Sequence, residues 1–262
     1  MPYSERYLRP TAKRVRNYLA DELFGIEGQS RWRILDLRWK DSQRLYRRIG
    51  RHRGDTARAR RDIARMDADS MYCSYTGDMD LDTDYIVFVN DATEATAVRL
   101  GEEMTHGEHM TTHIRNLGAV SRYTERFSGT TTEFMGFLGL RSVERENNGI
   151  TFDYFDYTGP DVLNPILDLT RDAEHYVGYS VSDQLINSRR RINYRDLFHA
   201  DSQAVVWDIV KSLIRPRIRV FIEPEKYCQL VVDAYNSLYE GVLERAELDA
   251  GIEISKKKRK KQ

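Results

Sequence analysis

Residues 85–89, with the sequence Tyr-Ile-Val-Phe-Val, form the clearest strand pattern in this 262-residue chain. The run is short, apolar and rich in β-branched and aromatic side chains, which favours a buried strand. Most other segments show the three- and four-residue apolar spacing of amphipathic helices. The sequence therefore predicts an α+β fold that is mostly helical and contains a small β-sheet.

Glycines, prolines and capping residues set the expected limits of the other elements. Asp91 with Glu94, and Thr130 with Glu133, have the spacing of a capping box at a helix start. The polar segment 70–84 is typical of a loop, and segments 150–157 and 217–222 are expected to be extended. Helices are expected over residues 5–24, 30–49, 91–116, 130–143, 172–187, 201–214 and 224–250, and an arginine-rich helix is expected after Gly54.

Composition excludes several classes of protein. Arg plus Lys and Asp plus Glu each number 41, so no overall charge attracts nucleic acid or membranes. Two cysteines do not make a disulfide framework, which favours a reducing, intracellular compartment. Neither a transmembrane segment nor a secretory signal is recognisable, so we expect a cytoplasmic protein without membrane contact. The run KKKRKK at 256–261 would allow a nuclear location in a eukaryote.

Charge is nevertheless unevenly distributed along the chain. Residues 31–65 contain thirteen Arg or Lys against four Asp, a local net charge of +9. We expect a basic helical N-terminal region (1–67), a main helical or α+β domain (68–250) and a disordered lysine-rich tail (251–262).

Three of the six histidines lie within eight residues of the helix predicted at 91–116. At ~100° per residue, Glu102, His106, His109 and His113 fall on one stripe of that helix. Imidazole and carboxylate groups bind divalent transition metals. The stripe spans about 16 Å of helix axis, so one zinc or other transition-metal ion takes only two or three of its groups.

The segment Glu102-Glu103-Met104-Thr105-His106 resembles the H-E-x-x-H helix of gluzincin-type zinc metallopeptidases, with Glu in place of the first His. Over residues 85–190 the order of elements is also similar, since a strand precedes the helix and later helices carry Glu133, His175 and Tyr179. The resemblance implies a zincin-like core, zinc bound by Glu133 and by His106 together with Glu102 or His109, and Glu103 as general base on water. It implies that His175 or Tyr179 stabilises the oxyanion of a substrate such as a peptide.

The sequence departs from that family in ways that leave activity open. The first His is missing, and the segment His109 to His113 has the His spacing but Met110 where the base would be. A degenerate, inactive descendant is one alternative. A carboxylate-bridged dimetal bundle is not supported, because it needs a second E-x-x-H and the chain has none.

Each candidate residue also has a purely structural interpretation. The histidines would hydrogen-bond to neighbours on a half-buried helix, Glu133 would complete a capping box, and His175 and Tyr179 would pack at an interface. On that interpretation the chain is a non-enzymatic helical module that binds nucleic acid or a protein. Its contacts would come from the basic tail and from exposed arginines of the second helix, Arg44, Arg47, Arg48 and Arg51.

Overall fold

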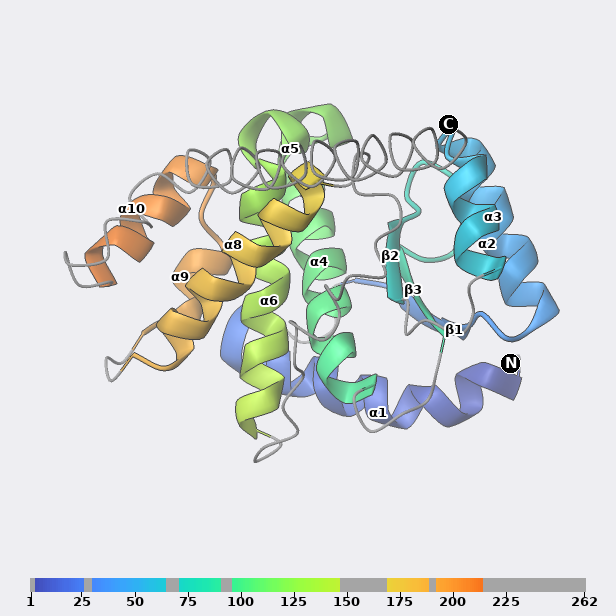
Figure 1. Cartoon of the computed structure of the whole chain (residues 1–262), viewed down its shortest axis with the longest axis horizontal. Coiled ribbons are helices and arrows are strands. Elements are labelled where there is room, and N and C mark those ends of the chain that lie inside the picture. The colour runs from blue at the N-terminus through green and yellow to red at the C-terminus, as the bar shows by residue number, and fades with distance from the viewer. Residues whose placement is uncertain are drawn as a thin grey trace, which may run out of the picture.

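The computed structural model describes residues 3–25, 30–64, 71–90, 96–146, 169–188 and 192–213. Three strands form one sheet in the order β1 (Trp32–Asp36), β3 (Tyr85–Val89) and β2 (Met71–Tyr75). β1 pairs with β3 in parallel, whereas β2 pairs with it antiparallel. The predicted α+β class, mostly helical with a small sheet, is therefore confirmed, and so is the strand at 85–89 (Figure 1).

Helices make up most of the described chain. They are α1 (Tyr3–Leu19), which continues as the π-helical turn η1 (Ala20–Phe24), α2 (Lys40–His52), α3 (Thr56–Ala64), α4 (Thr96–Leu117), α5 (Val120–Arg126), α6 (Gly129–Glu146), α8 (Leu169–Ile186), α9 (Tyr194–Phe198) and α10 (Gln203–Leu213). None of these described helices is both long and apolar enough to cross a membrane.

Both faces of the sheet are covered by helices, which explains why β3 is apolar at every position. Tyr85, Val87 and Val89 join the core made with α1, α4, α6 and α8. Ile86 and Phe88 point the other way, into a smaller core made with α2 and α3. In Figure 1, α2 and α3 lie on one side of the sheet, and α4, α6 and α8 lie on the other.

The helix predicted over 30–49 is wrong in its first half. Residues Trp32–Asp36 form β1, and α2 begins only at Lys40, after Trp39 in an extended conformation. The apolar spacing of Trp32 and Leu35 suits a helix, but Ile34 and Leu35 are buried in different cores on opposite faces of the sheet. Pairing with β3 thus satisfies both side chains, which one helix face would not.

The loop predicted over 70–84 is also wrong at its start, because Met71–Tyr75 form β2. Antiparallel pairing with the buried β3 imposes this strand on a sequence of weak pattern. The sheet takes β1 from the predicted N-terminal region and β2 and β3 from the predicted main domain, so it crosses the expected boundary at residue 67.

Other predicted elements have mixed outcomes. The helices expected at 5–24, 172–187 and 201–214 agree with α1 plus η1, α8 and α10. Most of the helix expected at 91–116 is α4, although its predicted cap at Asp91 and Glu94 lies outside the described residues. The extended segments at 150–157 and 217–222, the helix at 224–250 and the tail at 251–262 all lie outside the described residues.

A buried polar cluster fixes α4 against α1 and the sheet. Arg16 of α1 donates to Glu108 of α4, with Nε 2.9 Å and Nη2 2.7 Å from Oε1. The Ser30 hydroxyl donates to Glu108 Oε2 at 2.7 Å, and the Tyr85 hydroxyl donates to Oε1 at 3.0 Å. Gly107 leaves the space that the Tyr85 ring fills. These contacts set the rotation of α4, and hence the direction in which Glu102 and His106 point.

Candidate metal centre

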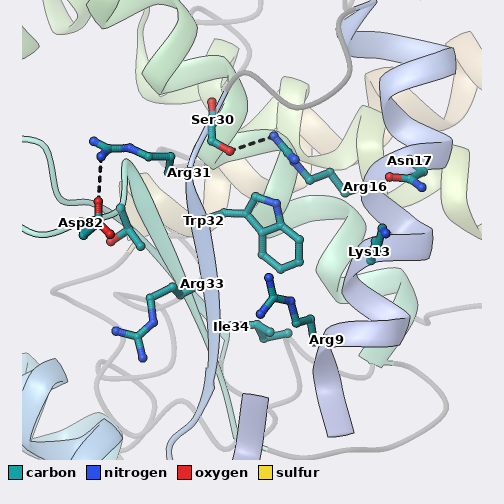
Figure 2. A pocket seen from close by; sticks show the side chains of 11 residues that line it. Arg9, Lys13, Arg16, Asn17, Ser30, Arg31, Trp32, Arg33, Ile34 and Asp82 are labelled. Atoms are coloured by element: carbon teal, nitrogen blue, oxygen red, sulfur yellow. Dashed lines mark hydrogen bonds and ion pairs between the residues drawn. The ribbon is translucent and has the colours of Figure 1, made fainter. Parts of the chain in front are cut away.

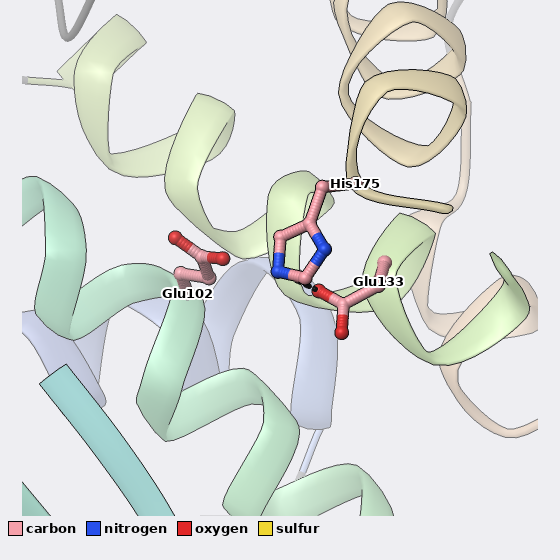
Figure 3. A group of neighbouring side chains, drawn as sticks. All are labelled: Glu102, Glu133 and His175. Atoms are coloured by element: carbon pink, nitrogen blue, oxygen red, sulfur yellow. Dashed lines mark ion pairs between the residues drawn. The ribbon is translucent and has the colours of Figure 1, made fainter. Parts of the chain in front are cut away.

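Three ligand-capable side chains converge from three helices. Glu102 comes from α4, Glu133 from α6 and His175 from α8, and one ligand atom of each lies within 4.8 Å of the other two. Figure 3 shows the Glu133 carboxylate beside the His175 ring, with Glu102 approaching from α4. All three residues are half-buried. They form the only such group of at least three His, Cys, Asp or Glu found within the described ranges.

Glu133 lies at the middle of this arrangement and contacts two imidazoles. Its Oε2 atom is 3.3 Å from His175 Nε2 and 3.5 Å from His106 Nε2. His106 is therefore a neighbour of the three-residue group, although it is not one of its members. Its other ring nitrogen, Nδ1, is buried and has no hydrogen-bond partner in the described part of the chain.

Glycines allow the three helices to approach closely enough for these contacts. A Cβ atom on Gly101 of α4 would lie 2.9 Å from the carbonyl oxygen of Gly139 on α6. A Cβ atom on Gly178 of α8 would lie 2.7 Å from the amide nitrogen of Phe134 on α6. Real side chains do not tolerate such distances, so larger residues would push α4 and α8 away from α6.

The predicted capping box at Thr130 and Glu133 is wrong, because α6 begins at Gly129, two residues earlier than that box requires. The Ser128 hydroxyl accepts from the Thr131 backbone N–H at 3.3 Å, and the Ser128 carbonyl accepts from Thr132 N–H. Thr130 already lies inside the helix and is buried. Since Ser128 provides the cap, the Glu133 carboxylate is directed to the two histidines instead.

Ion pairs hold α8 against α6 beside the centre. Arg141 of α6 pairs with Asp183 of α8 and with Glu144 of its own helix. Its guanidinium also lies 5.5 Å from the ring centroid of Tyr179. The Tyr179 ring packs edge-on against Phe137.

The clustered charges shift two pKa values. Burial raises the pKa of Glu102 to about 8, and the negative charges of Glu103 and Glu133 add to that shift. Burial alone would lower the pKa of His106, but the carboxylates of Glu133, Glu103 and Glu102 outweigh it and raise the pKa to about 9. At neutral pH both groups therefore carry a proton that a metal ion would have to displace.

The donor set is chemically suited to a transition metal. Two carboxylates and one imidazole, with a second imidazole adjacent, combine the ligand types found at zinc, iron and manganese sites. The residues present therefore fit a divalent transition metal.

His109 and His113, which the stripe also nominated, lie elsewhere. His113 Nε2 donates to the Phe198 carbonyl oxygen at 2.9 Å, and His109 Nδ1 lies 3.0 Å from the Tyr123 hydroxyl. The His109 ring is surrounded by aromatic rings, including that of Phe127 at 4.9 Å. Burial lowers the pKa of both histidines, and each is further disfavoured as a cation by neighbouring histidines. The described contacts of these two residues are with Tyr123, Phe127 and Phe198 and not with the candidate metal centre.

Glu103, the predicted base, is half-buried next to the group. Its charge acts on Glu102 and His106 and extends to Cys73 of β2, whose thiol pKa is raised by burial and then by Glu103. The four nominated arginines of α2, Arg44, Arg47, Arg48 and Arg51, are exposed.

Sequence reasoning named every member of this group but missed the residues that bring them together. A Cβ atom on Gly136 would overlap the His106 ring, so this glycine makes room for the imidazole. Gly136 and Gly139 are one turn apart inside a helix, where glycine is unfavourable by about 1 kcal/mol relative to alanine. That local cost was the available signal of a close approach.

No protein-family model matches the chain, and neither a curated protein nor a solved structure does.

Proposed function

We propose that this chain binds one divalent transition-metal ion, zinc being the first candidate, and acts as a metal-dependent hydrolase. The observation that carries the proposal is the convergence of Glu102, Glu133 and His175 from three separate helices. His106 would be the fourth ligand, since its Nε2 atom lies 3.5 Å from the shared Glu133 oxygen. His175 thus becomes a proposed metal ligand and no longer a proposed oxyanion group.

The remaining residues suggest how hydrolysis would proceed. A bound ion of this kind supplies Lewis acidity that lowers the pKa of water or polarises a carbonyl group. Glu103, the residue after the proposed ligand Glu102, would accept a proton from the attacking water. We propose a peptide as the substrate, because the segment 102–106 resembles the helix of zinc metallopeptidases. A zincin-like core is part of the same proposal.

Metal analysis of the purified protein tests the first part. After reconstitution with zinc, manganese or ferrous iron and removal of excess metal, we expect about one equivalent of one metal per chain. Glu133→Gln and His175→Gln should weaken binding by at least about tenfold. Glu125→Gln and His52→Gln make the same chemical changes at exposed positions and should not. Less than ~0.2 equivalents in the wild-type protein would overturn the proposal.

Activity is tested separately from metal binding. A mixed peptide library would be incubated with the metal-loaded protein and its products identified by mass spectrometry. Glu103→Gln should retain the metal and abolish cleavage, because it removes the base without removing a ligand. Cleavage that survives this substitution would contradict the role of Glu103, and metal binding without any cleavage would indicate an inactive descendant.

Exposure of the α2 arginines supports a second candidate, binding of nucleic acid. Arg47, Arg48 and Arg51 are exposed, and Arg44 pairs with the exposed Asp41 at 3.2 Å. Binding through phosphates should weaken steeply with salt and on neutralising these four arginines. Nucleic-acid binding that is equal at low and high salt would argue against this surface.

A further inference from the structure

The outward face of α2 carries a row of cations. The buried residues of this helix, Ser42, Tyr46 and Ile49, fall on one stripe, and the last two pack into the smaller core beside the sheet. At ~100° per residue, the five exposed Lys and Arg side chains of α2 fall within about 100° of one another, opposite that buried stripe. They are Lys40, Arg44, Arg47, Arg48 and Arg51. The row spans about 16 Å of helix axis and faces away from the core.

Few carboxylates lie along this row. Residues 40–64 contain nine Arg or Lys against three Asp. Asp62 accepts from the Tyr46 hydroxyl and pairs with Arg58, and Asp41 pairs with Arg44. Four exposed cations of α2 have no ion pair within the described part of the chain: Lys40, Arg47, Arg48 and Arg51. Like charges three or four residues apart destabilise a helix, so an anion bound along the row would stabilise α2.

α3 extends this charge beside α2. The two helices approach closely, because a Cβ atom on Gly50 of α2 would lie 2.6 Å from the Cβ atom of Ala59 on α3. In Figure 1 they lie side by side on one face of the sheet. Arg60 and Arg61 of α3 are exposed, and neither has an ion pair with another described residue. Together with the row of α2 these two arginines form one surface, here called the basic face.

The cations of the cleft between α1 and β1 are placed differently. In Figure 2, Arg16 lies inside that cleft, where it donates to the Ser30 carbonyl oxygen at 3.0 Å, and it also pairs with the buried Glu108. α1 packs into the core on the opposite face of the sheet from α2 and α3. Lys13 and Arg14 of α1 are exposed, so they provide control positions of equal charge away from the basic face.

The composition of the basic face favours contacts to phosphates over contacts to bases. None of the exposed residues in 40–64 is Phe, Tyr or Trp, and none is Ser, Thr, Asn or Gln. Single strands are bound largely by stacking on aromatic rings, and RNA by stacking and by polar contacts to the 2′-hydroxyl. Arginine and lysine side chains alone are sufficient for the phosphates of a duplex. A DNA duplex presents about nine charges over ~16 Å of its axis, about twice as many as one strand.

We propose that the basic face binds the phosphate backbone of double-stranded DNA without reading its sequence. This inference rests on the second candidate function, nucleic-acid binding through α2, and it adds α3 and the form of the nucleic acid. It does not depend on the candidate metal centre, because Glu102, Glu133 and His175 belong to α4, α6 and α8. Single-stranded DNA, duplex RNA and an acidic protein are the alternatives that the test separates.

Fluorescence anisotropy with labelled nucleic acids is the test. The full chain, with EDTA present, is titrated against a DNA duplex of about 20 base pairs, one of its single strands and an RNA duplex of the same sequence, at about 50 mM salt. We expect a dissociation constant below about 100 μM for duplex DNA, and constants at least about threefold weaker for the other two. The logarithm of the association constant should fall linearly with the logarithm of the salt concentration, with a slope of about −4 or steeper.

Substitutions on α2 assign the binding to the basic face. Arg47→Gln with Arg51→Gln should weaken binding of duplex DNA at least about tenfold and reduce the salt slope by about two. Lys13→Gln with Arg14→Gln removes the same charge from α1, is the matched control and should stay within about threefold of wild type. Arg47→Lys with Arg51→Lys should also stay within about threefold, because attraction to phosphates depends on charge. Equal effects of the two Gln pairs would overturn the assignment.

Substitutions on α3 test whether both helices take part. Arg60→Gln with Arg61→Gln should weaken binding of duplex DNA at least about fivefold. An effect no larger than that of Lys13→Gln with Arg14→Gln would overturn the surface shared by two helices. Circular dichroism of each variant checks that the helices are retained.

The remaining outcomes separate this inference from the proposals on which it does and does not rest. A preference for duplex DNA of less than about threefold over the single strand or the RNA duplex would overturn the inference and leave nucleic-acid binding in place. Failure of all three to bind below about 100 μM would overturn both. Poly-glutamate that displaces duplex DNA at equal charge would favour an acidic protein and overturn the inference. Glu133→Gln should leave DNA binding unchanged, so the metal proposal fails or stands separately.

Discussion

His175 Nε2 lies 3.3 Å from Glu133 Oε2, although the two residues come from different helices, α8 and α6. The same carboxylate oxygen is 3.5 Å from His106 on α4. One side chain of α6 thus connects the two helices that pack on either side of it. This relationship makes Glu133 the residue whose loss should affect both histidines together.

Glu133→Gln should therefore lower the pKa of His106 in the metal-free protein. The amide removes a negative charge and a charge-assisted contact that raise this pKa to about 9, whereas the burial that lowers it remains. The titration of His106 followed by NMR should move toward the ordinary value of 6.5 or below. Glu125→Gln on α5 is the control, and an unchanged His106 titration in Glu133→Gln would contradict the geometry.

Metal affinity should rise steeply with pH. His106, with a pKa of about 9, and Glu102, with a pKa of about 8, are both protonated at neutral pH without metal. A ligand must lose its proton to bind, so each proton displaced adds up to about tenfold in affinity per pH unit. Competition with a chelator of known pH dependence, between pH 6 and 9, measures the slope. A flat profile would show that neither group is deprotonated on binding.

The stability of the metal-free protein should fall as the pH rises, whereas metal affinity should increase. Both groups have pKa values raised above their usual 6.5 and 4.5, so each stabilises the fold while protonated. That stabilisation is complete below the usual value and is lost as the pH rises through about 8 for Glu102 and about 9 for His106. Urea denaturation of metal-free protein should thus show falling stability from about pH 5 to 9. Added metal should reverse the trend.

Gly136→Ala should weaken metal binding through His106. Its Cβ atom would overlap the His106 ring and displace it from Glu133, although alanine favours a helix by about 1 kcal/mol. We expect a loss of about tenfold or more in metal affinity. The control is a double-mutant cycle with His106→Ala, in which the ring is absent and Gly136→Ala should stabilise the fold. Equal effects of Gly136→Ala with and without the His106 ring would contradict the proposed collision.

Apolar spacing was sufficient to predict the secondary structure of segments whose own side-chain pattern decides it. β3, α8 and α10 follow their apolar spacing, and Gly25 ends the first helical segment at a φ of 71°, where glycine is favoured. Pattern failed where pairing partners decide the structure. The sequence predicts a helix where β1 forms, because the side chains of β1 are buried on both faces of the sheet. β2 has little apolar pattern of its own, and its strand conformation depends on pairing with β3.

The candidate site shows the same limit. Helix periodicity placed Glu102, His106, His109 and His113 on one stripe. It does not reveal which side chains from other helices lie opposite each turn of that stripe. Only the first two meet Glu133 and His175, whereas His109 and His113 meet Tyr123, Phe127 and Phe198. Contacts between distant helices depend on glycine positions along α4, α6 and α8, which spacing within one helix does not reveal.

Glu108→Ala should be among the most destabilising single substitutions in the protein. It leaves Arg16 and Tyr85 without their shared buried carboxylate, and breaking one partner of a buried ion pair costs about 3–5 kcal/mol. The exposed pair of Asp41 and Arg44 is the control, and Asp41→Ala should cost less than about 1 kcal/mol. Urea denaturation measures both. Similar losses for the two would show that Arg16 and Glu108 are not paired in the folded protein.

His113→Ala should reduce stability and leave metal binding intact. It removes the donor to the Phe198 carbonyl oxygen and opens a cavity beside Phe127, which together should cost about 2–4 kcal/mol. Because the ring faces that cluster and not Glu133, metal stoichiometry and affinity should stay within about threefold of wild type. His175→Ala should show the reverse, losing metal while changing the stability of the metal-free protein much less, since His175 is half-buried. Loss of metal in His113→Ala at full stability would restore the whole stripe as a ligand set and remove the distinction between its two halves.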